Sequence, residues 1–355
     1  MQKLRCFSKI KILSFIISSV IVSSAFEVLL ADDLKIYEAK LEEVAFNMHF
    51  TDIQKIIPAE ETIFVLEMKN HRIIFIKDKK IIGQIGKIGN GKGEFYYPSD
   101  FFIDKHGLFY VLDKGNYRIQ ILDSKGIYLS DFPDYPESWG LAVNSKGEIL
   151  LGQPALNNLV SVYNPKGKRL RSFGSLINPS EIYGMDYKKY NETHKVPLNR
   201  IRIALDENDN AWLVFLHAPL ICKYNQKGEL IYKKILNIPD LQPLKKAIWQ
   251  SPPPYEYASI NIDGIQLTMI IRDITFDPKK KQILILLGDQ RIVAFNSEAN
   301  EQFIIKPKFK EGSLRDLSVN KNGEIFVSIF FSPKCYKLIL SSEKEDKKKI
   351  EGGEL

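Results

Sequence analysis

Short apolar runs separated by polar turns fill most of the 355-residue chain. The clearest unit runs through Phe64–Glu67 and Asn70–Ile73, and the same order returns 46 residues later at Tyr110–Asp113 and Asn116–Ile119. Runs of about five apolar residues bounded by Asp, Asn and Gly turns are typical of strands joined in a β-meander. No helical 3.6-residue period is sustained in these units, so the sequence predicts an all-β fold.

Four weaker copies follow the first two units. They share a polar turn, an apolar run and a closing turn, and they open near Gly147, Asp206, Phe276 and Val319. A single meander leaves its edges and faces exposed, whereas units arranged radially cover one another. The repeat therefore predicts one six-bladed β-propeller over residues 34–340.

A glycine-rich motif connects the first two units. Its residues are Gly86, Gly89, Gly91, Gly93, Glu94, Phe95 and Pro98, followed by Gly107, Asp113, Asn116 and Arg118. Together they resemble an NHL repeat in nearly full form over residues 83–126, and this family implies a six-bladed propeller. Asp113, Asn116 and Arg118 fall at a corner between strands, where they can hydrogen-bond backbone groups of the turn and of the neighbouring blade. We interpret them as structural residues.

The two ends of the repeat region predict how the propeller closes. Leu34–Leu41 alternates well enough to be a strand, and we expect it to pair with the third strand of the last blade near Tyr336–Leu340. Residues 341–355 are charged and poor in apolar side chains, which predicts a disordered C-terminal tail.

The first thirty residues differ from the rest. Their basic residues are Lys3, Arg5, Lys9 and Lys11. No acidic residue precedes Glu27, and Ile12–Val22 contains only apolar residues and serine. This order is that of a secretory signal peptide, and the apolar run is short for a membrane span. We predict a signal peptide over residues 1–25, with an uncleaved N-terminal anchor as the alternative, and a secreted, periplasmic or cell-envelope location.

Removal of residues 1–25 would also lower the formal net charge from +7 to about +3. Such a mild excess, together with export, argues against a nucleic-acid partner and makes RNA binding the weakest functional hypothesis. We expect a monomeric propeller that binds a protein or peptide. Cys222 and Cys335 fall on similar strands of non-neighbouring blades, so we expect two buried thiols rather than a disulfide.

Two connections are too long for simple turns, at about residues 174–200 and 237–270. Both are rich in aromatic side chains, and long insertions in compact domains are often functional. The alternative is that they pack down as lids. The predicted binding residues on this face are Trp139, Tyr183, Tyr187, Arg202, Trp249, Tyr255, Tyr257, Arg272 and Arg315.

Aligned inner strands place further polar residues at the mouth of the central channel. The aligned positions are Asp100, Gly140, Arg202, Asp273 and Asp316, with Asp52 as the expected member from the first blade. Asp100, Asp273 and Asp316 could hold Ca²⁺ through oxygen ligands. We favour the alternative, in which aspartate and arginine neutralise one another around a water-filled channel, so no cofactor is expected.

Two functions remain open. The five histidines fall at unlike places in the repeat and no pair has metal-ligand spacing, so we favour a binding scaffold over an enzyme. Some propellers related to this family are metal-dependent lyases or lactonases. A metal-dependent hydrolase or lyase with its site at the channel mouth is therefore the alternative function.

Overall fold

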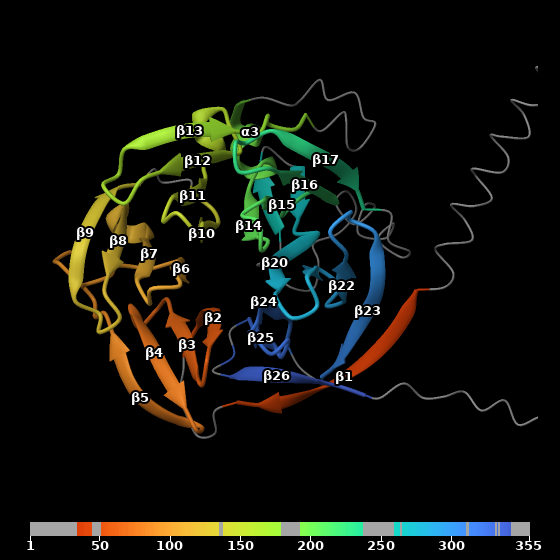
Figure 1. Ribbon diagram of the computed structural model, residues 1–355, viewed down its shortest axis with the longest axis horizontal. Coiled ribbons are helices and arrows are strands. Elements are labelled where there is room, and N and C mark those ends of the chain that lie inside the picture. The colour runs from red at the N-terminus through yellow and green to blue at the C-terminus, as the bar shows by residue number, and fades with distance from the viewer. Residues whose placement is uncertain are drawn as a thin grey trace, which may run out of the picture.

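The computed structural model describes residues 34–44, 51–134, 138–178, 192–236, 259–262, 265–309, 312–330, 332 and 334–341. Its strands form sheets that stand radially around a central axis (Figure 1). The predicted six-bladed β-propeller is confirmed. The predicted signal peptide and almost all of the predicted tail lie outside the described residues. Among the described residues, no helix is both long and apolar enough to span a membrane.

Four blades are separate four-stranded antiparallel sheets. Blade 1 contains β2 (Ile53–Ala59), β3 (Thr62–Glu67), β4 (Arg72–Lys77) and β5 (Lys80–Ile85). Blade 2 contains β6 (Asp100–Ile103), β7 (Phe109–Asp113), β8 (Arg118–Leu122) and β9 (Tyr128–Pro133). Blade 3 contains β10 (Leu141–Val143), β11 (Ile149–Gly152), β12 (Val160–Tyr163) and β13 (Arg169–Phe173). Blade 4 contains β14 (Ile201–Leu205), β15 (Ala211–Phe215), β16 (Leu220–Tyr224) and β17 (Leu230–Ile235).

Blades 5 and 6 share one eight-stranded sheet. Its strands are β20 (Ile271–Asp277), β21 (Gln282–Leu287), β22 (Ile292–Phe295), β23 (Glu301–Lys308), β1 (Lys35–Glu43), β26 (Cys335–Leu340), β25 (Ile325–Ile329) and β24 (Leu314–Val319). The antiparallel pairing of β1 with β26 sets Ala39 opposite Leu340 and confirms the predicted closure. β1 also runs parallel to β23, with Lys35 opposite Phe303, so one N-terminal strand joins two blades.

The smaller elements lie in the connections. They are the 3₁₀ turns η1 (Lys114–Asn116) and η2 (Pro154–Leu156), the helix α3 (Glu192–Leu198), and the hairpin of β18 (Ser259–Ile262) and β19 (Ile265–Thr268). α3 belongs to the first long connection and the β18–β19 hairpin to the second. The repeat pattern predicted neither.

The hydrophobic core lies between blades. The middle strands β7, β15 and β21 are buried along their whole length because both faces pack on other blades. Each buried Ile, Leu or Val contributes roughly 1.5–3 kcal/mol. Cys222 and Cys335 are buried free thiols, as expected, and burial raises the pKa of each to about 12.

The antiparallel meander gives the disc two different faces. The connections between blades and the corners between second and third strands lie on one face, here named the connection face. The turns between first and second strands, and between third and fourth strands, lie on the opposite face, here named the turn face. Each inner strand therefore begins at the connection face and ends at the turn face.

Candidate functional site

A hydrogen-bonded network surrounds the fully buried carboxylate of Asp113 at the corner of blade 2. The backbone N–H of Tyr96 donates to its Oδ1 at 2.7 Å, and Asn116 and Arg118 donate to its Oδ2 at 2.8 and 2.9 Å. Arg118 also donates to two carbonyls of the glycine-rich loop, residues 86–98. The side chains do hydrogen-bond backbone groups as predicted, but the acceptors are in the loop that leaves blade 1 rather than in a strand of that blade, and the bonds join blade 2 to this loop.

An exposed aromatic cluster lies beside this network on the connection face. Tyr96 and Tyr97, in the loop leading into β6, are 42% and 44% exposed, and Tyr117 at the blade 2 corner is 57% exposed. The rings of Tyr96 and Tyr97 are 4.8 Å apart between centroids. His71, from the corner of blade 1, lies 5.5 Å from Tyr96 and 4.9 Å from Tyr97. Sequence analysis missed all four residues as site candidates.

Three of these aromatic residues have a left-handed backbone. The φ angles are 55° at His71, 46° at Tyr97 and 52° at Tyr117. Such a conformation costs a non-glycine residue roughly 1–2 kcal/mol, and strained residues of this kind cluster at functional sites. Local hydrogen bonds stabilise these backbone conformations. The Tyr97 N–H donates to His71 Nδ1 at 2.9 Å, and the Tyr117 N–H donates to the Lys114 carbonyl at 3.1 Å.

Trp139, a predicted binding residue, continues the cluster around the channel. It leads into β10 and is half-buried between two cations. Lys114 Nζ lies 4.1 Å from its ring centroid and the Arg200 guanidinium carbon lies 4.3 Å from it. We name His71, Tyr96, Tyr97, Tyr117 and Trp139 the aromatic arc, because they follow the connection face from blade 1 to the edge of blade 4.

A ring of six residues, five of them charged, lies at equivalent positions of the inner strands and is here named the polar ring. Its members are Lys55, Asp100, Gly140, Arg202, Asp273 and Asp316. The expectation that Asp52 represents blade 1 is wrong. Lys55 pairs with Leu66 at the position where Asp100 pairs with Leu112. The inner strand of blade 1 ends at Ala59, without the Asp or Asn that marks this end in the other blades, so the alignment had no reference point for Lys55.

Two ring carboxylates bind the exposed edge of the next blade. Asp273 accepts a hydrogen bond from the Leu317 N–H at 2.9 Å, and Asp316 accepts one from the Ile56 N–H at 2.8 Å. The inner strand of each blade is a sheet edge with unpaired N–H groups, and burying these without a partner would be costly. The ring therefore joins blade 5 to blade 6 and blade 6 to blade 1.

Electrostatics in the ring favour an ammonium on Lys55 and a proton on Asp316. Burial lowers the pKa of Lys55, but attraction to Asp100, Asp273 and Asp316 outweighs it and the net pKa is raised. Burial and the neighbouring Asp273 raise the pKa of Asp316 well above its ordinary value. Lys55 Nζ lies 2.8 Å from Asp100 Oδ1. The described residues contain no group of three His, Cys, Asp or Glu that could hold a metal, and the calcium hypothesis stays a prediction.

The three predicted binding arginines occupy different settings. Arg202 Nη1 lies 3.8 Å from Asp100 Oδ2, across the position where Gly140 has no side chain. Arg272 is buried and donates to carbonyls of both blade 5 and blade 6, and Arg315 pairs with Asp52 of the chain entering blade 1. Arg272 and Arg315 thus join blades. The other predicted residues, Tyr183, Tyr187, Trp249, Tyr255 and Tyr257, lie outside the described residues.

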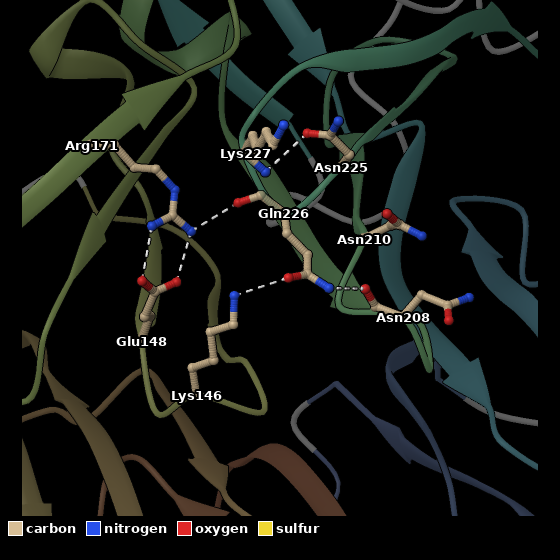
Figure 2. A pocket seen from close by; sticks show the side chains of 8 residues that line it. All are labelled: Lys146, Glu148, Arg171, Asn208, Asn210, Asn225, Gln226 and Lys227. Atoms are coloured by element: carbon tan, nitrogen blue, oxygen red, sulfur yellow. Dashed lines mark hydrogen bonds and ion pairs between the residues drawn. The ribbon is translucent and has the colours of Figure 1, made fainter.

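A polar crevice of about 630 Å³ separates blades 3 and 4 on the turn face. It is lined by Lys146, Glu148, Arg171, Asn208, Asn210, Asn225, Gln226 and Lys227. Figure 2 shows Arg171 paired with Glu148 through both of its terminal nitrogens and also donating to the Gln226 carbonyl. Lys146 donates to the Gln226 side chain at 3.1 Å. Because these groups hydrogen-bond one another across the crevice, we interpret the crevice as an interface that holds blades 3 and 4 together.

Comparisons with known proteins agree with this architecture. Residues 45–140 match a family model described as a 6-bladed beta-propeller. Protein brain tumor of Drosophila melanogaster is 29% identical to this chain over 113 residues, which cover 29% of this chain and 11% of that protein. The chain is a six-bladed β-propeller.

Solved structures resemble this propeller over most of its length. A streptogramin B lyase is 12% identical with a TM-score of 0.52, covering 85% of this chain and 97% of its own. An inactive virginiamycin B lyase from Staphylococcus aureus with quinupristin is 13% identical with a TM-score of 0.53, covering 87% and 90%. At these identities the likeness establishes the fold and carries no statement about activity.

Proposed function

We propose that this NHL-type propeller is an extracytoplasmic scaffold that binds a protein or peptide through its connection face. The aromatic arc is the observation that carries the proposal. It places three half-exposed tyrosines and a tryptophan on one face, on a backbone held by hydrogen bonds. The extracytoplasmic location rests on the composition of residues 1–25.

The chemistry of the arc favours a peptide partner. Tyrosine and tryptophan supply a large contact area at low cost in side-chain entropy, which is why they dominate binding hot spots. Lys114 and Arg200 flank Trp139, so acidic side chains of a partner would find cations beside the aromatic rings.

A selection from a displayed peptide library tests the proposal. Protein that lacks residues 1–25 would be used to select peptides. The affinity of these peptides would then be compared between this protein and a variant carrying Tyr96→Ala, Tyr97→Ala and Tyr117→Ala. We expect at least a tenfold loss of affinity with little change in Tm, because hot-spot aromatics each cost more than 1 kcal/mol when truncated.

The matched control removes equally exposed apolar side chains elsewhere. Ile82→Ala and Ile127→Ala lie on or beside the outer strands β5 and β9 and are 58% and 59% exposed in the native protein. This control should keep the full affinity. Selected peptides that bind the tyrosine variant as well as the native protein would refute the proposal.

The second candidate function is a metal-dependent hydrolase or lyase. Its basis is that Asp100, Asp273 and Asp316 all attract Lys55 in the ring and that carboxylates are ligands of hard cations, although among the described residues no three such groups are placed to hold a metal. Elemental analysis of protein purified without added metal or chelator tests it. Near-stoichiometric metal that is lost in the Asp273→Ala, Asp316→Ala variant would support an enzyme. Metal-free protein that is inactive on lactones and esters would exclude it.

A further inference from the structure

A cavity of about 290 Å³ lies in the central channel, on the turn-face side of the polar ring. All six inner strands line it. Residues of its wall include Ile57, Pro58, Phe102, Ile103, Ala142, Ala204, Leu205, Thr275, Phe276, Ser318 and Val319. Those nearest the turns, such as Leu205 and Val319, are partly exposed, whereas the ring aspartates are buried, so the cavity opens at the turn face. It is separate from the aromatic arc.

The inner end of the cavity presents opposite charges side by side. Lys55 and Asp273 both line it, and the Lys55 side chain is 22% exposed. The hydrogen bond from Lys55 to Asp100 uses one of the three ammonium protons. A ligand can therefore meet both a donor and an acceptor at this end.

A buried polar atom in the cavity wall, Ser318 Oγ, has no hydrogen-bond partner among the described residues. Ser318 is 8% exposed. Buried polar atoms of native proteins are nearly always paired, so an unpaired hydroxyl in a cavity wall indicates a partner that is not part of the chain.

We propose that this cavity binds a small zwitterion with an apolar side chain, of the free α-amino acid class. Its carboxylate would lie against Lys55, its ammonium against Asp273, and its side chain along the apolar wall. The volume lies near the lower limit for small-molecule sites. A ligand with only a carboxylate would meet the negative field of the ring aspartates, and one with only an ammonium would meet Lys55. Neither charge alone matches the inner end.

Three probes with the same aromatic body separate these possibilities. Phenylalanine carries both charges, 3-phenylpropionate only the carboxylate and phenethylamine only the ammonium. Calorimetric titration of each probe into protein that lacks residues 1–25 should show phenylalanine binding at least tenfold more tightly than the other two. No binding of phenylalanine, or equal or tighter binding of a singly charged probe, would overturn the proposal.

Two variants locate the binding. Ala142→Leu fills the cavity and should abolish phenylalanine binding, whereas Ala155→Leu, at an exposed position of η2, should leave it unchanged. Lys55→Met should remove the preference for phenylalanine over phenethylamine. If Lys55→Met fails to fold, Ala142→Leu still decides, because unchanged binding in that variant would place the ligand elsewhere. Displacement of phenylalanine by Ca²⁺ alone would assign the inner end to a cation and overturn the proposal.

Discussion

Two buried carboxylate networks hold neighbouring blades together, and they differ in how completely their hydrogen bonds are made. At the corner of blade 2, both oxygens of Asp113 accept hydrogen bonds, and the donors include a guanidinium, an amide and a backbone N–H. In the channel, one oxygen of Asp100 faces Lys55, and the other faces Arg202 at 3.8 Å without a hydrogen bond among the described residues. A complete network over solid core is structural, whereas an incomplete one beside a cavity is a candidate site.

The two networks also differ in where their members come from. Asn116 and Arg118 lie within five residues of Asp113, so the corner forms locally and is repeated in blade 1 around Glu67. The ring takes one residue from each blade and exists only when the propeller has closed. Its completeness therefore depends on the whole fold rather than on one repeat.

The largest effect is expected at the corner. Asp113→Ala leaves Arg118 and a backbone N–H without their acceptor, and breaking a buried pair in this way costs about 3–5 kcal/mol. Urea unfolding measures the loss. The control is Asp123→Ala in the exposed turn after β8, where the carboxylate accepts two backbone N–H bonds and removal should cost about 1 kcal/mol. Equal losses would contradict the comparison.

A substitution in the polar ring should lower the unfolding free energy less than Asp113→Ala does, and Gly140→Ala tests this. Gly140 has φ of 79°, and a Cβ there would lie 3.0 Å from the Ile201 carbonyl of blade 4. The matched control is Gly147→Ala in the same blade, with φ of 75° and no atom within 4 Å of its added Cβ. Both carry roughly 1–2 kcal/mol of backbone strain, so only the extra loss in Gly140→Ala measures contact with the next blade. Equal unfolding free energies for the two variants would show that blades 3 and 4 can move apart enough to accommodate the added Cβ at position 140.

The parts predictable from sequence were those encoded locally. The spacing of Asp113, Asn116 and Arg118 indicates a corner network, and the alternation of Leu34–Leu41 indicates a closing strand. The parallel pairing of β1 with β23 could not be predicted, because alternation does not say which second strand an outer strand will meet.

The candidate site was predictable only in part, for two physical reasons. Lys55 was missed because the inner strand of blade 1 ends at Ala59, without the Asp or Asn that marks this end in the other blades. Aromatic residues are common in cores, so the sequence does not indicate that Tyr96, Tyr97 and Tyr117 are exposed. Their exposure follows from the geometry of their loops, which includes a left-handed backbone at Tyr97 and Tyr117. Such geometry leaves no signal in a single sequence.

Asp316→Asn should change the unfolding free energy by a smaller amount, and the sign of that change tests the protonation of Asp316. Burial beside Asp273 raises the pKa of Asp316 in the native state above the ordinary value of 3.8, although Lys55 opposes the shift. The native state then holds a proton that the unfolded chain releases, so stability from this group is present at low pH and is lost as pH rises through the raised pKa. The amide cannot titrate but still accepts the Ile56 bond. Relative to the native protein, the variant should gain unfolding free energy between pH 4 and pH 8, and a loss would contradict the raised pKa of Asp316.

The smallest change in stability is expected in the aromatic arc, from Tyr117→Gly. The native side chain is 57% exposed and its φ is 52°, so glycine relieves roughly 1–2 kcal/mol of strain while losing little packing. Glycine in turn costs about 0.5–1 kcal/mol of chain entropy, which leaves the two effects nearly balanced. Thermal unfolding should therefore show a Tm close to that of the native protein, while affinity for a selected peptide falls. A loss of stability as large as that of Asp113→Ala would mean that Tyr117 belongs to the structural corner and that the arc is not a binding surface.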